Sequence, residues 1–113
     1  MSPEAQRIAI AEACGWTINP DPKDHSGFRY YAPKGTSRFL GRFALPYYLN
    51  DLNAMHEAEK ILTHEQRIDH MEWLGMCSDD YGYKAWAYVH ADAAQRAEAF
   101  LRTIGKWEEE GQP

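Results

Sequence analysis

The stretch "GFRYYAPKGTSRFLGRF", residues 27–43, decides whether this chain contains a sheet. Its first part, "FRYYA" (28–32), is rich in aromatic residues, which favour strands. The next residues, "PKGTS" (33–37), have the composition of a turn, and "RFLGRFAL" (38–45) has that of a returning strand. The stretch therefore predicts a β-hairpin.

The same stretch carries a charge opposite to that of the chain. It contains Arg29, Lys34, Arg38 and Arg42 but none of the chain's 17 Asp and Glu residues. The whole chain has a net charge of -5 and a pI of about 5.5. Such a chain is a poor general binder of DNA, because affinity for the phosphate backbone requires many Lys and Arg residues. A local basic patch instead predicts contact with a small anion.

Length and composition indicate one small globular domain. The chain has 113 residues, of which we assign 1–107 to a single domain and 108–113 to a disordered acidic tail. No apolar run approaches the length of about 18 residues that a membrane helix needs. The first residues lack the basic flank of a secretory signal. The two cysteines, Cys14 and Cys77, lie far apart in sequence and predict buried thiols in a reducing cytoplasm.

Capping residues predict the first two helices. A helix over 2–14 has Ser2 as its N-cap, Pro3 at its first position, and Gly15 directly after its end. A second helix is expected to begin after Asn50, because Asn is a common N-cap and the apolar residues that follow keep a helical spacing.

Two further helices begin at capping boxes. Thr63 with Gln66 starts one helix, and Asp92 with Gln95 starts the best helix of the chain, which ends at Gly105. Each box pairs a short polar side chain with a Gln three residues later. The expected apolar side of the third helix consists of Ile68, Met71 and Leu74 or Gly75.

The order of elements predicts the fold class. A strand is expected within "YKAWAYVH" (83–90), between the last two helices, and Trp107 is expected to fold back over the end of the last helix. The connections around 30–45 are too short for a crossover between parallel strands. We therefore predict an α+β domain in which helices pack on an antiparallel sheet, as in a layered sandwich.

No motif for catalysis, a metal or a cofactor is present. The histidines lack the spacing of HExxH, and neither a P-loop, a GxGxxG sequence nor a GxSxG elbow occurs. Asp79 and Asp80 offer paired carboxylates for a divalent ion, but a turn explains them equally well. We therefore expect a protein that is not an enzyme and uses neither a metal nor a cofactor.

The basic hairpin is the strongest candidate for a binding site. Guanidinium groups bind phosphate through paired hydrogen bonds, and flat rings stack on bases. The alternative is a sheet whose aromatic rings face the core and whose basic side chains face water. Trp86 in particular also suits the core. The candidate ligand-binding residues are Arg29, Tyr31, Lys34, Arg38, Phe39, Arg42, Tyr47, Tyr48, Trp86, Tyr88 and His90.

Three blocks in order resemble a family of small phage proteins, the phage ABA-sandwich domain proteins. These blocks are "IAEACGWT", "LPYYLNDLNAMHEAEKIL" and "HADAAQRAEAFLRTIGKW", spread over roughly residues 7–107. The group is similar to the first Thoeris anti-defence family, whose members sequester cyclic ADP-ribose isomers, and in some cases cyclic oligonucleotides, without cleaving them. Region 63–88 departs from the shorter members of the family.

The resemblance implies a phage-encoded sponge for a cyclic nucleotide immune signal. It further implies a homodimer or hexamer in the cytoplasm of an infected bacterium, with no contact with long nucleic acid or a membrane. The alternative is an acidic phage inhibitor that binds a host defence or nucleic-acid-processing protein directly. A small hydrolase of the signal ranks last. The acidic surface of the alternative would include Glu57, Glu59, Asp69, Glu72, Asp79 and Asp80.

Overall fold

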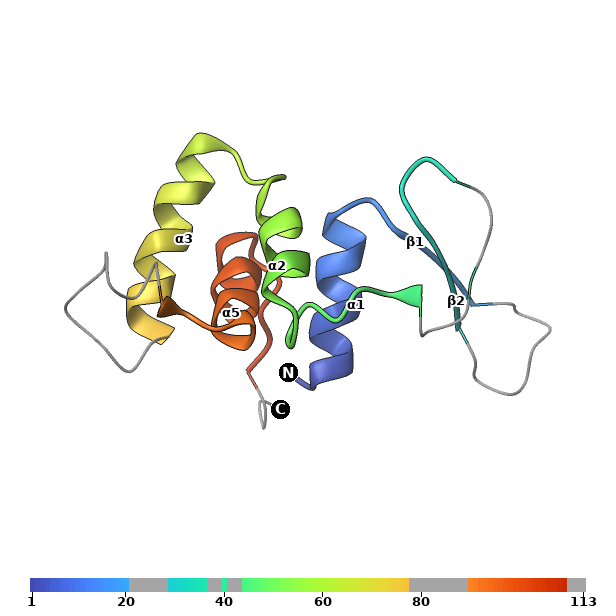
Figure 1. Cartoon of the computed structure of the whole chain (residues 1–113), viewed down its shortest axis with the longest axis horizontal. Helices are drawn as coiled ribbons and strands as arrows, with labels where there is room; N and C mark the ends of the chain where they lie inside the picture. The colour runs from blue at the N-terminus through green and yellow to red at the C-terminus, as the bar shows by residue number, and fades with distance from the viewer. Residues whose placement is uncertain (21–28, 37–39, 41–43, 78–89, 110–113) are drawn as a thin grey trace.

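The computed structural model describes residues 1–20, 29–36, 40, 44–77 and 90–109. Within them the chain forms four α-helices and two short strands (Figure 1). Along the long axis of the molecule, α3 lies at one end, the strands lie at the other end, and α5, α2 and α1 lie between them. Their bounds are α1 Pro3–Ala13, β1 Thr17–Pro20, β2 Arg29–Ala32, α2 Leu52–Glu59, α3 His64–Cys77 and α5 Ala93–Thr103.

The predicted fold class is wrong. Among the described residues, the only paired strands are β1 and β2, an antiparallel ribbon in which Thr17 lies opposite Ala32 and Pro20 opposite Arg29. Two four-residue strands cannot supply a layer broad enough to cover several helices. The domain is mostly helical, and its core lies between helices. None of the described helices combines the length and the hydrophobicity of a membrane span.

The predicted hairpin is present in part. The expected strand "FRYYA" contains β2, and Tyr31 also exchanges backbone hydrogen bonds of 2.7 and 2.8 Å with Leu40. Leu40 belongs to the expected returning strand, whose neighbouring residues 37–39 and 41–43 lie outside the described residues. The strand expected within 83–90 also falls outside them, except for its last residue, and stays a prediction.

Capping chemistry predicts the first helix correctly. The Ser2 hydroxyl accepts a hydrogen bond from the Ala5 amide at 3.1 Å, and Pro3 opens the helix. Gly15 follows the end of α1 with a φ of +97°, a conformation that glycine adopts without strain. The chain therefore turns sharply from α1 into the ribbon.

The caps of the next two helices are predicted with one error. The N-cap of α2 is Asp51 and not Asn50, because the Asp51 carboxylate accepts a hydrogen bond from the Asn53 amide at 2.9 Å. The capping box before α3 is confirmed. The Gln66 amide donates to the Thr63 hydroxyl at 3.1 Å, and the Thr63 amide donates to the Gln66 side chain at 2.9 Å.

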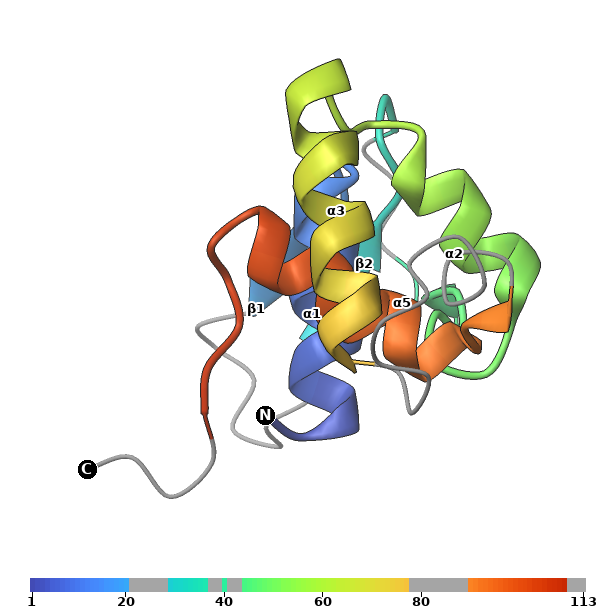
Figure 2. The same ribbon diagram turned by 90° about the vertical axis from the view of Figure 1, so that its left-hand side faces the viewer.

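The central element is α5, which contacts α1, α2 and α3. Figure 2 shows α5 crossing behind α3. Its capping box of Asp92 with Gln95 is as predicted, and so is Gly105 after its end, with a φ of +75°. A helix with neighbours on several sides needs apolar or paired side chains over most of its surface. The buried residues of α5 are Ala93, Arg96, Ala97, Ala99, Phe100 and Leu101.

Two apolar clusters pack on α5. The larger one joins α5 to α1, α2 and the ribbon, and the smaller one joins Ala99 to Leu74 of α3 and to Ala91. The members of the larger cluster are Ile10, Ala11, Tyr31, Leu45, Tyr48, Met55, Ala58, Leu62, Ala93, Ala97, Phe100 and Leu101.

The predicted apolar side of α3 is wrong in part. Leu74 is buried as expected, but Ile68 is 52% exposed and Met71 is 39% exposed. The side chain buried one turn before Leu74 is that of His70. The helix therefore turns a polar side chain towards α5, and this orientation has a partner on α2, described below.

Replacement of Phe100 by Ala should lower the free energy of unfolding by about 3–5 kcal/mol, because it empties the centre of the larger cluster. Urea denaturation followed by circular dichroism measures this change. The control is Ala94→Ser on the exposed side of the same helix, which should change stability by about 0.5 kcal/mol or less. A similarly small effect at Phe100 would contradict the central place of α5.

Candidate functional site

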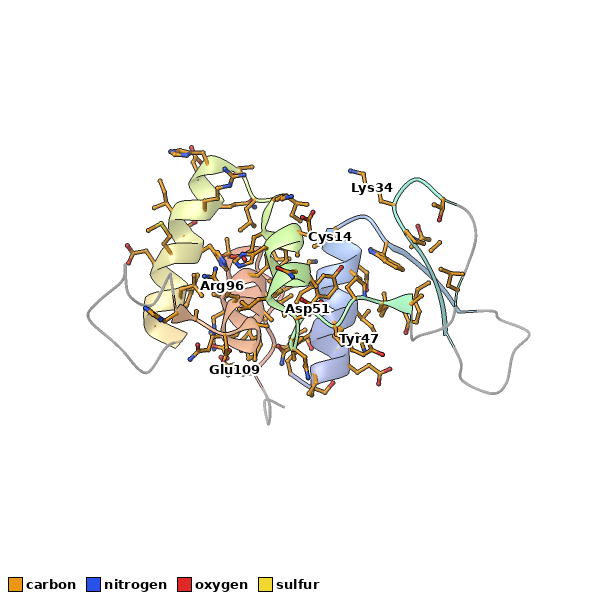
Figure 3. All side chains as sticks on the ribbon, in the orientation of Figure 1. Cys14, Lys34, Tyr47, Asp51, Arg96 and Glu109 are labelled. Atoms are coloured by element: carbon orange, nitrogen blue, oxygen red, sulfur yellow. The ribbon has the colours of Figure 1, made fainter. Side chains whose placement is uncertain are left out.

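The described part of the basic segment lies at one end of the molecule. Arg29 begins β2, opposite Pro20 of β1, and Lys34 lies in the turn that follows β2. Figure 3 shows the Lys34 side chain at the edge of the molecule, and it is exposed. Its aliphatic stem packs over Gly15, where a Cβ atom would come within 2.9 Å of Lys34 Cδ. Gly15 therefore provides the space that the Lys34 stem occupies.

Two candidate tyrosines lie in the core. Tyr31 and Tyr48 are 2% and 3% exposed and belong to the larger apolar cluster. Burial, together with the neighbouring Cys14 thiol, raises the pKa of Tyr48. Neither tyrosine presents a ring face to solvent, so both serve to join the ribbon and the segment before α2 to the core.

The cysteine prediction holds only in part. Cys14 is half-buried and packs against the larger cluster instead of lying fully inside it. Burial raises the pKa of the Cys14 thiol, although a hydrogen bond with Tyr48 acts in the opposite direction. The side chain of Cys77 lies outside the described part of the chain.

Tyr47 differs from the two buried tyrosines because it is 52% exposed. The Arg7 guanidinium lies over its ring, with 4.6 Å between Cζ and the ring centroid. Arg7 also donates to the Leu45 carbonyl at 2.9 Å and to the Pro46 carbonyl at 3.2 Å. Arg7 of α1 therefore fixes the segment that joins the basic stretch to α2.

Of the other predicted site residues, the structure describes only His90, which does not lie at the ribbon. His90 is exposed and precedes Ala91, which packs against Leu74 of α3 at the opposite end of the molecule from the ribbon. The remaining candidates lie outside the described residues: Arg38, Phe39, Arg42, Trp86 and Tyr88.

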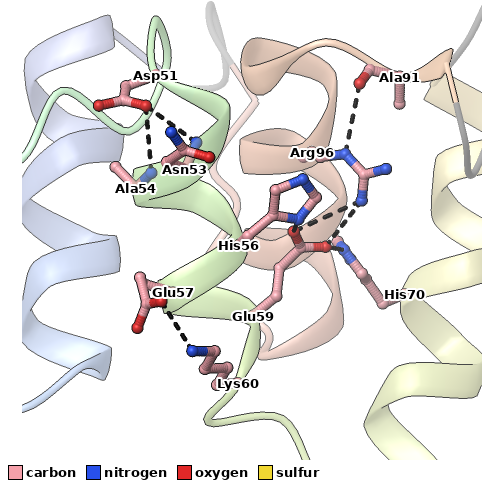
Figure 4. A network of polar contacts seen from close by, with 10 residues as sticks. All are labelled: Asp51, Asn53, Ala54, His56, Glu57, Glu59, Lys60, His70, Ala91 and Arg96. Carbon is pink, nitrogen blue, oxygen red and sulfur yellow. Dashed lines mark hydrogen bonds and ion pairs between the residues drawn. The ribbon is translucent and has the colours of Figure 1, made fainter.

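A cluster of polar side chains lies between three helices (Figure 4). Glu59 at the end of α2 contacts His70 Nε2 of α3 at 2.5 Å and Arg96 Nη1 of α5 at 3.1 Å. The Arg96 Nε group donates to the Ala91 carbonyl at 3.4 Å, and His56 Nδ1 lies 3.3 Å from the Glu59 carboxylate. One carboxylate thus joins α2, α3 and α5.

Glu59 is ionised in this cluster and pairs with Arg96. Burial raises the pKa of the Glu59 carboxyl, but the hydrogen bond with His70 and the electrostatic interactions with His70, Arg96 and His56 together hold it below the ordinary value of 4.5. The Arg96 guanidinium is buried, and an unpaired charge there would be very unfavourable. The carboxylate and the guanidinium therefore stabilise one another.

The chemistry of this cluster is that of a structural ion pair. The Arg96 cation neutralises the Glu59 carboxylate, and among the described residues no group of three His, Cys, Asp or Glu side chains is arranged to hold a metal ion. His70 Nδ1 is buried and meets no hydrogen-bond partner in the described structure. The cluster therefore offers a fixed contact between the three helices.

Sequence reasoning missed Glu59, His70 and Arg96 as a group. Each of these three residues lies four positions from a buried apolar residue of its own helix. Because residues four apart share a helix face, this spacing places the polar side chain on the core-facing side. Three polar positions with this spacing, one of them acidic and one basic, are the signal that the sequence offers. The buried apolar residues four positions away are Met55 for Glu59, Leu74 for His70 and Phe100 for Arg96.

Comparisons of the chain with models of protein families, with curated proteins and with solved structures return no match.

The pH dependence of stability tests the ionised state of Glu59. Because its pKa is lower in the folded than in the unfolded chain, the stabilisation is present above about pH 4.5 and is lost as the pH falls through the folded-state pKa. We expect Glu59→Gln to be less stable than the unchanged protein by about 1.5–3 kcal/mol at neutral pH, and this difference to shrink in acid.

Urea titrations of both proteins across the acidic range measure the difference. The matched control is Glu57→Gln, whose carboxylate pairs with Lys60 at 2.7 Å on the exposed side of the same helix. Exposed pairs contribute about 1 kcal/mol or less. A difference for Glu59→Gln that stays constant from neutral pH to acid would contradict an ionised, paired Glu59.

Proposed function

We propose that the protein binds a small phosphate-bearing ligand through the basic stretch 27–43 and holds it without cleaving it. The ligand class implied by the resemblance is a cyclic nucleotide immune signal, which a phage-encoded protein would sequester. Because the predicted sandwich is wrong, this proposal rests on the distribution of charge and not on a shared fold.

The proposal is carried by the contrast between the cations of the ribbon and those of the helices. Arg7 binds two carbonyls and a tyrosine ring, and Arg96 and Arg102 bind carboxylates. Lys34 is exposed and pairs with no carboxylate in the described part of the chain. In the sequence, the same stretch also contains Arg29, Arg38 and Arg42, and no acidic residue lies within 27–43. Positive charge is therefore available to an outside anion at this end of the molecule.

The position of Lys34 suits a binding role. Its stem rests on Gly15, so part of the entropy that a lysine loses on binding is already lost in the folded protein. Exposed Arg67 and Lys106 offer a comparison, because each has an acidic residue two positions away in the sequence. A phosphate approaching either of them meets repulsion as well as attraction.

Calorimetric titration with a cyclic ADP-ribose isomer tests the proposal. Lys34→Ala and Arg38→Ala should each weaken binding by about 1.5–3 kcal/mol if the residue makes a charge-assisted contact with phosphate. Lys106→Ala removes a cation elsewhere and should leave the affinity unchanged. Equal affinities for all three variants would contradict a site on the basic stretch.

The fate of the ligand separates the classes of function. Heat denaturation of the loaded protein should release the ligand unaltered, as shown by mass spectrometry. A degraded ligand would indicate a hydrolase, and a protein that retains no ligand before heating would favour the alternative below.

The alternative, direct contact with a host protein, is favoured by a different surface. On α3, Ile68, Met71 and Met76 are exposed, and Asp69 is exposed beside them. Ile68 and Met71, three residues apart, are neighbours on the helix surface, and exposed apolar side chains that lie together are typical of sites that contact another protein. Glu59, which the sequence assigned to the acidic surface of this alternative, lies instead in the cluster between helices.

A further inference from the structure

The segment after α5 folds back on the helix. Gly105, with a φ of +75°, reverses the chain directly after the C-cap residue Ile104. The Gly105 amide donates to the Arg102 carbonyl at 3.2 Å, and the Lys106 amide donates to the Leu101 carbonyl at 2.8 Å. These bonds close the end of the helix. We call residues 105–109 the C-terminal strap.

Arg102 holds the strap. Its guanidinium carbon lies 5.1 Å from the centre of the Trp107 ring and 5.2 Å from the centre of the Trp73 ring of α3. The guanidinium also donates to Glu109 at 2.9 Å and to Glu98 at 3.2 Å. The prediction that Trp107 folds back over the end of the last helix is therefore confirmed. The surface formed by Trp73, Glu98 and Arg102 receives a tryptophan and, two residues later, a carboxylate.

The strap packs well in one respect and poorly in another. The Trp107 side chain covers part of the larger apolar cluster, which favours the docked position. Its indole Nε1 is buried and meets no hydrogen-bond partner in the described structure, and an unpaired buried donor is unfavourable. Glu109 is 55% exposed, so its ion pair with Arg102 contributes little. The docked strap therefore combines favourable apolar packing with an unpaired buried donor and an ion pair of small contribution.

We propose that the surface of Trp73, Glu98 and Arg102 is a docking site for the strap of a second copy of this chain. In the single chain the site is filled by the chain's own strap, and in a pair of chains the straps are exchanged. The occupant is identified by its chemistry, a Trp followed two residues later by a Glu, and the strap itself has that chemistry.

A single hinge permits the exchange. The strap leaves α5 at Gly105, whose φ is +75°, and a glycine backbone has more accessible conformations than that of any other residue, so this position can act as the hinge. Exchange of an identical element preserves the contacts of the closed form and requires no new surface. The site lies on α3 and α5 and includes no residue of the basic ribbon, so exchange of the strap does not depend on the proposed ligand.

Two full-length variants with complementary defects test the exchange. The double variant W107A/E109Q keeps the docking site but lacks a competent strap. The variant R102Q keeps the strap but lacks the cation of the site. Each variant alone should remain monomeric in native mass spectrometry and analytical ultracentrifugation, whereas their mixture should form a one-to-one dimer.

We expect at least about tenfold more dimer in the mixture than in either variant alone, a difference of about 1.4 kcal/mol. A mixture of W107A/E109Q with a chain that combines R102Q with W107A should stay monomeric, because no competent strap remains. Circular dichroism checks that each variant is folded.

Two outcomes would overturn the proposal. One is a mixture of folded variants that contains no more dimer than its components. The other is a dimer that forms equally well when Trp107 is absent from both chains. If W107A/E109Q does not fold, W107L, which keeps an apolar side chain but removes the ring beside Arg102, takes its place in the same mixture, with the same expected and contradictory results.

Discussion

The ion pair between Glu59 and Arg96 is the constraint on which the arrangement of the helices depends. Since α5 has α1, α2 and α3 as neighbours, little of its surface faces water, and its guanidinium at position 96 is buried. A buried cation requires an anion at close range. Glu59 supplies it from α2, and His70 of α3 contacts the same carboxylate. The three helices therefore meet at one carboxyl group, in an arrangement that apolar packing alone would not specify.

Several arginines of the helical body are already paired within the protein. Arg7, Arg96 and Arg102 are committed to carbonyls, rings or carboxylates of the helical body. The ribbon projects from that body and leads into the exposed turn that carries Lys34, supported by Gly15. Lys34 thus gives an acidic protein an exposed cation at this end, and the proposed binding function starts from this residue and from the charge of the basic stretch in the sequence.

Local chemistry in the sequence predicted the boundaries of the helices well, whereas contacts between distant residues could not be predicted in the same way. Ser2, Thr63 and Asp92 each accept a hydrogen bond from a backbone amide at the start of a helix, and such contacts involve residues only a few positions apart. By contrast, the aromatic stretch that suggested a sheet forms only a ribbon, because Tyr31 contributes its ring to a core between helices. Likewise, apolar periodicity assigned Ile68 to the inner side of α3, whereas His70 faces inward, where it contacts the Glu59 carboxylate of α2. A polar contact between two helices outweighs the apolar pattern of one helix.

A double-mutant cycle on Glu59 and Arg96 tests the central claim most directly. Glu59→Gln, Arg96→Met and the combined variant would be unfolded in urea at neutral pH, and the coupling free energy obtained from the four proteins. If the carboxylate and the guanidinium stabilise one another, the combined variant should be more stable than the sum of the single losses predicts, by about 1–3 kcal/mol. Losses that add to within about 0.5 kcal/mol would show that the two groups act independently and would contradict this account.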